Sequence, residues 1–167
     1  KLKIESLQTI DTSCQCFDDW YLDITYISRK KVYLLIHIKT RVAFVFPNSE
    51  IRGTAHLFKA LALRLQALFT QCGNERLANN AYHFFTEEDI FFVKNNDKSV
   101  TPYATQLKYR ILREISMGYS LNQKLCDVVS KKWLNNPMKK TPSQESYITP
   151  LELMLNLISQ EGWVVYH

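Results

Sequence analysis

Glycine and proline are scarce in this chain, which has 4 Gly and 5 Pro among its 167 residues. Few positions can therefore form tight turns, which argues for long elements and against a sandwich of many short hairpins. The sequence has no apolar run of about 18 residues, so no transmembrane helix is expected. Lys3, Glu5 and Gln8 interrupt the first ten residues, which therefore lack the apolar segment of a secretory signal peptide.

Cysteine is also rare, and its spacing excludes a recognisable metal site. The four cysteines are Cys14, Cys16, Cys72 and Cys126. No second close pair and no suitably spaced His completes a zinc site. We therefore expect reduced thiols in an intracellular protein, located in the nucleus if the host is a eukaryote and otherwise in the cytoplasm.

Apolar and aromatic side chains are abundant, at 46% and 13% of the residues. That content suits a single domain, which we place over residues 1–167, with residues 1–15 as a lead-in. The first residue is not Met, which leaves open that the chain is a piece of a longer protein. The net charge of +5 and the isoelectric point near 9.0 are compatible with nucleic-acid binding but do not establish it.

Three β-rich segments follow one another near the start of the chain. Residues 20–28 alternate between two faces, as a strand does, and residues 29–31 predict a turn. Residues 32–40 and 41–47 are two further β-rich runs. Short connections between three consecutive strands predict an antiparallel meander. The second run is apolar on both faces, so we expect it to be covered on both sides.

The periodicity then becomes helical. Apolar residues at helical spacing predict a helix over residues 54–69, with Thr54 as its N-cap. Residues 70–80 contain turn-forming residues and predict a loop that could include a short, degraded strand. Residues 81–89 predict a short helix, and residues 90–94 predict a brief buried strand.

Three more helices are expected in the second half of the chain. They cover residues 104–118, residues 121–135, and a segment that begins at Pro150 after the N-cap Thr149. The tail from residue 161 either returns as a strand or packs against a partner. This order predicts an α/β fold, with a mixed sheet that starts as a three-strand meander and has helices packed on it.

Three segments carry a resemblance to a known family. Residues 20–27, which read WYLDITYI, place an aromatic residue three positions before an Asp and a Thr two positions after it. Residues 133–137 read WLNNP, and residues 149–153 read TPLEL. Over residues 15–158 the chain resembles the catalytic core of retroviral and retrotransposon integrases and of DDE transposases. The resemblance implies an RNase H-like fold.

Enzymes of this family hold two divalent ions with three carboxylates, because Mg²⁺ prefers hard oxygen ligands. The resemblance assigns the first acid, a metal ligand, to Asp23 in the middle of the first strand. An exposed strand residue is the ordinary alternative. No Asp-Asn-Gly turn occurs where the second acid belongs, and Glu75 is the candidate there. A solvated loop glutamate is the alternative for Glu75.

The third acid should be a Glu about one turn into the helix that follows residues 101–106. Lys108 or Tyr109 occupies that place in this chain. Glu114 lies further along the same helix and is the remaining candidate, with an exposed helical glutamate as the alternative. A cation at the third position would repel a metal ion, so the resemblance implies a degenerate triad.

Basic residues gather on the same helix and on the next one. Lys108, Arg110 and Arg113 lie on the helix that faces DNA in integrases, and Lys131 and Lys132 end the following helix. Cations in place of an acid would keep phosphate contacts while removing the chemistry. These five residues are our candidates for nucleic-acid binding, and a solvated helix face is the alternative.

The leading hypothesis is a catalytically inactive integrase-like domain, derived from a mobile element, that needs no cofactor. It would bind nucleic acid such as DNA, dimerise or act as a scaffold; the family implies a homodimer or larger assembly, with no membrane contact. One alternative is an active Mg²⁺-dependent strand-transfer enzyme that uses Asp23, Glu75 and Glu114. Another is a purely protein-interaction domain.

Overall fold

The computed structural model describes residues 17–87, 89–90, 92, 97–139 and 146–161. In these residues three strands come first, followed by five α-helices and two short 3-10 turns. The strands are β1 (Trp20–Ile27), β2 (Lys30–His37) and β3 (Ala43–Pro47). The helices and turns are η1 (Asn48–Glu50), α1 (Thr54–Gln71), α2 (Glu75–Glu87), η2 (Lys98–Val100), α3 (Thr101–Ser116), α4 (Gln123–Leu134) and α5 (Pro150–Gln160).

The strands form one antiparallel sheet in the order β1-β2-β3, so the predicted meander is confirmed. The middle strand is also covered on both faces as expected, since residues 32–37 are all buried. Ser28 and Arg29, with φ of 49° and 64°, form the turn between β1 and β2. Two consecutive positive φ values match the twist of a tight hairpin. The turn therefore begins one residue earlier than predicted.

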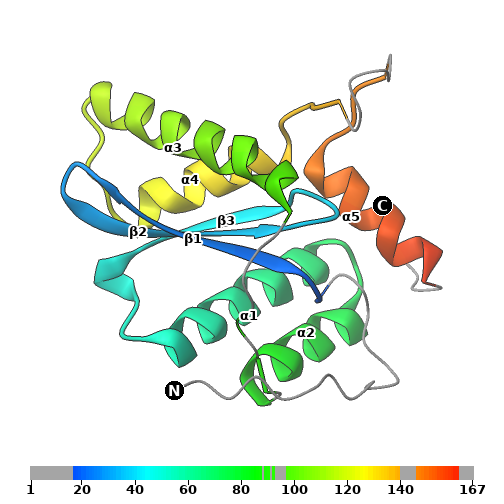
Figure 1. The fold of residues 1–167 in the computed structure, drawn as a ribbon. Coiled ribbons are helices and arrows are strands. Elements are labelled where there is room, and N and C mark those ends of the chain that lie inside the picture. The colour runs from blue at the N-terminus through cyan, green and yellow to red at the C-terminus, as the bar shows by residue number, and fades with distance from the viewer. Residues whose placement is uncertain (1–16, 88, 91, 93–96, 140–145, 162–167) are drawn as a thin grey trace.

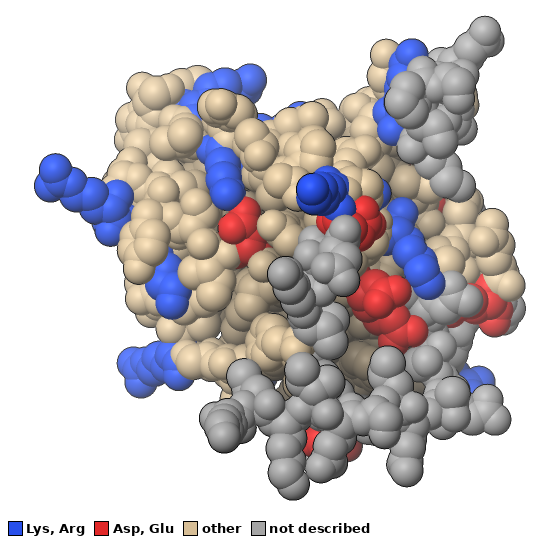
Figure 2. Space-filling view, in the orientation of Figure 1, with Lys and Arg blue, Asp and Glu red and all other residues tan. Residues whose placement is uncertain are grey.

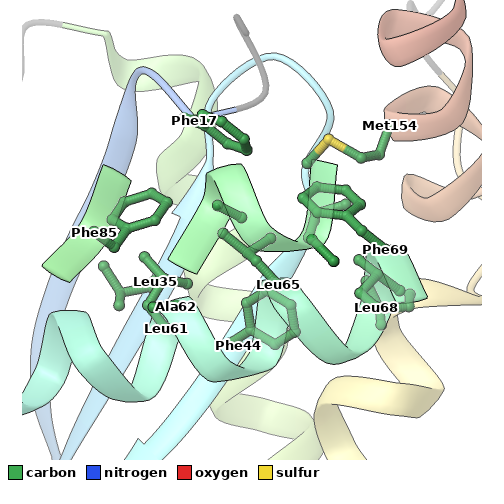
Figure 3. Close-up of a cluster of buried hydrophobic side chains, with 14 of the residues drawn as sticks. Phe17, Leu35, Phe44, Leu61, Ala62, Leu65, Leu68, Phe69, Phe85 and Met154 are labelled. Atoms are coloured by element: carbon green, nitrogen blue, oxygen red, sulfur yellow. The ribbon is translucent and has the colours of Figure 1, made fainter. Parts of the chain in front are cut away.

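Helices α1 and α2 cover one face of the sheet, as Figure 1 shows. Because side chains alternate along a strand, Leu35 and Phe44 both point to this face. They join a buried apolar cluster with Leu65 of α1 and Phe85 of α2 (Figure 3). Phe17, just before β1, packs against the same cluster, with its ring centroid 6.3 Å from that of Phe85. This face is held by aromatic and aliphatic packing.

Helices α3 and α4 cover the opposite face (Figure 1). The alternate strand residues Leu34, Ile36 and Val45 pack there against Ile111 of α3 and Trp133 of α4. All five side chains are almost fully buried. The sheet is therefore enclosed between two helical layers, which explains why β2 reads as a continuous apolar run.

Helix α4 also covers the outer edge of β3. The Val45 N–H donates to Ser130 Oγ at 3.0 Å, and the Ser130 hydroxyl donates to the Cys126 carbonyl at 2.7 Å. Trp133 Nε1 donates to the Arg41 carbonyl at 2.8 Å. Backbone groups that an edge strand would leave unpaired therefore find side-chain partners on α4.

Helix α2 corrects the prediction for the middle of the chain. We expected a loop with a degraded strand over residues 70–80 and a short helix over residues 81–89, but Glu75–Glu87 forms one continuous helix. Asn74 supplies its cap, since Asn74 Oδ1 accepts a hydrogen bond from the Leu77 N–H at 2.9 Å. The buried positions have helical spacing: Leu77, Ala78, Ala81 and Phe85.

The remaining helices agree with the predictions apart from their ends. Thr54 is the first residue of α1 and not its N-cap, because Gly53, with φ of 116°, takes the cap position. Thr149 caps α5 as predicted, in a capping box with Glu152. The predicted strand over residues 90–94 and the tail after residue 161 lie largely or wholly outside the described residues.

The described part of the chain is thus an α/β fold with an antiparallel three-stranded sheet between two helical layers, and α5 lies beside them (Figure 1). We expected a mixed sheet, but every described strand pair is antiparallel. None of the helices in the described ranges is both long and apolar enough to cross a membrane.

Candidate functional site

Asp23 lies on the β1 face that points toward α3. Its Oδ2 is 2.7 Å from Nζ of Lys108, and the two side chains are 17% and 32% exposed. A carboxylate this far from solvent needs a cationic or hydrogen-bonding partner, and Lys108 supplies one. Tyr21, two positions earlier on the same face, shares these surroundings: burial first, and then the Asp23 charge, raise the pKa of Tyr21.

The ion pair also decides between the two residues proposed for the place of the third acid. Lys108 turns toward β1, whereas Tyr109 is 68% exposed. An ammonium group therefore stands next to Asp23, where a divalent ion bound by that carboxylate would have to lie. The positive charges of the Lys108 ammonium group and of a divalent ion would repel each other strongly at this distance, so the Asp23–Lys108 pair does not fit a metal site.

The other two acid candidates lie elsewhere. Glu75 is an exposed residue in the first turn of α2, on the opposite side of the sheet from α3 (Figure 1). Glu114 lies six residues beyond Lys108, which is about 9 Å along the axis of α3. It is buried and forms an ion pair with Lys132 Nζ of α4 at 2.8 Å.

The structure therefore does not bring Asp23, Glu75 and Glu114 together. Within the described ranges, no group of three or more His, Cys, Asp or Glu side chains could hold a metal ion. Cys72 and Cys126 are free thiols, and burial, followed by the Asp127 charge, raises the pKa of Cys126 to about 12. A thiol with so high a pKa is a poor nucleophile and a poor metal ligand at neutral pH.

A small cleft opens between α3 and α4, with a volume of about 140 Å³. Three cations, one carboxylate and one apolar side chain line it: Arg110, Arg113, Lys132, Glu114 and Val129. Three positive charges against one negative charge leave the lining with a net charge of +2. Three of the five residues that we proposed for nucleic-acid binding therefore meet at one place.

Arg110 contacts two residues of the segment at the end of α4. Its Nη2 donates to Asn136 Oδ1 at 2.5 Å, and its guanidinium lies 5.3 Å from the centroid of the Trp133 ring. Burial first, and then the charge of Arg113, lower the pKa of Arg110. Two cations that are held close together gain from an anion between them, because the anion offsets their mutual repulsion.

The other two basic candidates have different surroundings. Lys108 forms the ion pair with Asp23 described above. Lys131 is exposed near the end of α4 and does not line the cleft. Asn136, which orients Arg110, was not among the predicted site residues. The Asn-containing run over residues 133–137 was the signal that could have indicated it.

Charge on the face of the molecule drawn in Figure 2 is mixed. Figure 2 shows Lys and Arg side chains distributed over one face, with acidic side chains beside several of them. The coloured residues on that face do not form one continuous basic patch. Recognition of an anion on this face would therefore depend on a local arrangement of cations more than on a broad electrostatic field.

Residues 1–153 match the family model of a domain of unknown function, DUF6933. The match covers most of the chain, so the chain belongs to this family. No curated protein matches it.

Proposed function

We propose that this protein is a non-catalytic nucleic-acid-binding domain that holds the phosphate backbone in the α3–α4 cleft. The observation that carries the proposal is the convergence of Arg110, Arg113 and Lys132 on one small cleft with a net charge of +2. Guanidinium groups donate paired hydrogen bonds in a plane and suit phosphate oxygens. Asn136 and Trp133 hold one of these groups in place before any ligand arrives.

The Asp23–Lys108 ion pair supports the non-catalytic part of the proposal. Two-metal phosphoryl transfer needs several carboxylates around ions about 4 Å apart. Here the first acid faces an ammonium group, and Glu114 is bound to Lys132. The alternative of an active strand-transfer enzyme that uses Asp23, Glu75 and Glu114 gains no support from this geometry.

An integrase-like, RNase H-like ancestry is part of the same proposal. The antiparallel meander followed by α1 matches the order expected for that fold. Glu75, the candidate for the second acid, lies in helix α2 and not in the loop with a short, degraded strand that we expected over residues 70–80.

Salt-dependent binding to a fluorescently labelled DNA or RNA oligonucleotide tests the proposed function. We expect Arg113→Gln to weaken binding and to reduce the slope of log affinity against log salt concentration by about 1, because one phosphate contact is lost. Lys59→Gln is the matched control, since Lys59 is exposed on α1, on the other side of the sheet. It should leave the slope unchanged.

Two results would overturn the proposal. Absence of nucleic-acid binding even at low salt would favour a domain that only binds proteins. Metal-dependent nicking or strand transfer that Asp23→Asn abolishes would restore the enzyme alternative.

A further inference from the structure

The C-terminal half of α3 and the residues just after it expose several large apolar side chains. Ten such side chains are exposed among the described residues, and four of them fall within residues 109–119. These four are Tyr109, Leu112, Met117 and Tyr119. The two tyrosines are the most open, with 68% and 58% of their surface exposed. Aromatic rings left in solvent next to a binding cleft are candidates for ligand contact.

Both tyrosines lie close to the cationic cleft. Tyr109 precedes Arg113 by four residues, so their side chains are neighbours on the surface of α3. The Tyr119 backbone N–H donates to the Glu114 backbone carbonyl at 3.2 Å, so the chain at Tyr119 stays next to the last turn of α3. The distance along α3 from Tyr109 to Ser116 is about 10 Å.

We infer that the nucleic acid recognised by this surface is single-stranded, with phosphates in the α3–α4 cleft and bases stacked on Tyr109 and Tyr119. The inference rests on the proposed function and specifies its ligand. The positive lining of the cleft complements the phosphates. An exposed aromatic ring can stack on any unpaired base, whereas the base faces in a duplex are already covered by neighbouring bases.

Binding of the full chain to three labelled probes tests the inference: oligothymidylate, oligouridylate and a DNA duplex of the same length. We expect Tyr109→Ala to weaken single-strand binding by roughly 5- to 150-fold, the usual effect of losing one stacked base. Duplex affinity and the salt slope should stay unchanged, because the phosphate contacts remain. Tyr109→Phe should keep the single-strand affinity, since its ring still stacks.

Tyr26→Ala is the matched control, because Tyr26 is 71% exposed but lies on β1 and not beside the cleft. It should change none of the three affinities. Tyr109 is exposed, so its variants should unfold at the same urea concentration as the wild type, and a shared folding defect would be visible in that measurement.

Three results would count against the inference. If Tyr109→Ala weakens single-strand and duplex binding equally, or not at all, the stacking role is wrong while the proposed function survives. If Tyr109→Ala and Tyr119→Ala instead convert a dimer to a monomer in sedimentation, without an effect on nucleic-acid affinity, the exposed residues Tyr109, Leu112, Met117 and Tyr119 form an interface with a second copy of the chain. If the wild type binds no nucleic acid, the proposed function itself fails.

Discussion

The α1/α2 side of the sheet is packed with apolar and aromatic side chains, whereas the α3/α4 side combines an apolar core with charged contacts between its elements. The first side holds Phe44, Phe69 and Phe85 in one cluster. On the second side, Lys108 joins α3 to β1, and Lys132 joins α4 to α3.

The difference indicates that the two sides contribute differently. Burial of apolar side chains stabilises the fold, and its free energy depends little on the orientation of each side chain. Ion pairs and hydrogen bonds fix the direction of individual side chains. The α1/α2 side therefore serves mainly as support, and the α3/α4 side both supports the sheet and orients the cations of the cleft.

Truncation of one large side chain on each side should have the largest effect and should separate the two roles. Phe69→Ala and Trp133→Ala should each lower the free energy of unfolding by about 3–5 kcal/mol, measured by urea denaturation. Both side chains are almost fully buried. Only Trp133→Ala should also weaken oligonucleotide binding by the folded protein, because Arg110 loses the ring beside it. Equal losses of affinity in both variants would contradict the division between the two sides.

Changing the charge of the cleft should have an intermediate effect. Glu114→Gln raises the net charge of the lining from +2 to +3 and should strengthen oligonucleotide binding by about three- to tenfold. Gln has nearly the same shape as Glu and keeps an oxygen that can accept from Lys132, so the folded structure should be retained although Glu114 is buried. Asp127→Asn is the control: Asp127 pairs with Arg64 outside the cleft. An equal gain in that variant would show that only the total charge matters.

The smallest effect concerns Tyr21 on the β1 face toward α3. Its folded-state pKa is raised above 10.0, so its contribution to stability is complete below pH 10.0 and is lost as the pH rises through the folded-state pKa. Asp23→Asn removes the second cause of the shift but not burial, the first. The pKa of Tyr21 should therefore fall toward the ordinary value without reaching it.

Ultraviolet absorption of tyrosinate measures this change, with Tyr21→Phe used to assign the signal to Tyr21. The stability lost above pH 10.0 should be smaller in Asp23→Asn than in the wild type. An unchanged titration of Tyr21 would show that Asp23 and Tyr21 do not interact across this face.

Much of the fold follows from local patterns. The alternation of side chains between two faces predicted β1 to within one residue of its observed end. The helical spacing of leucines predicted α1 to within two residues of its observed end. The predicted helix over residues 81–89 overlaps α2, but residues 75–80 at its start were missed because Gly73 and several Asn residues indicated a turn. Asn74 in fact caps the helix. Burial of the apolar residues after it offsets the low helix propensity of its Asn residues.

The candidate site was only partly predictable. The sequence indicated Asp23 as a candidate acid and Arg110 and Arg113 as candidate phosphate-binding cations. It also showed Lys108 as a cation where the resemblance implies an acid. The Asn-containing run over residues 133–137 drew attention to Asn136 but not to its contact with Arg110, and the sequence did not indicate that Glu114 would be buried against Lys132. Those contacts depend on how α3 lies against α4, and side-chain spacing within one helix does not contain that information.

The sequence by itself determined which segments become strands and helices, because backbone propensity and hydrophobic periodicity act over neighbouring residues. The tertiary structure decided which charges meet. Asp23 and Lys108 come together because α3 crosses the face of β1, and three cations share a cleft because α4 packs beside α3. These pairings form between residues distant in sequence, and they determine what the α3/α4 side can bind.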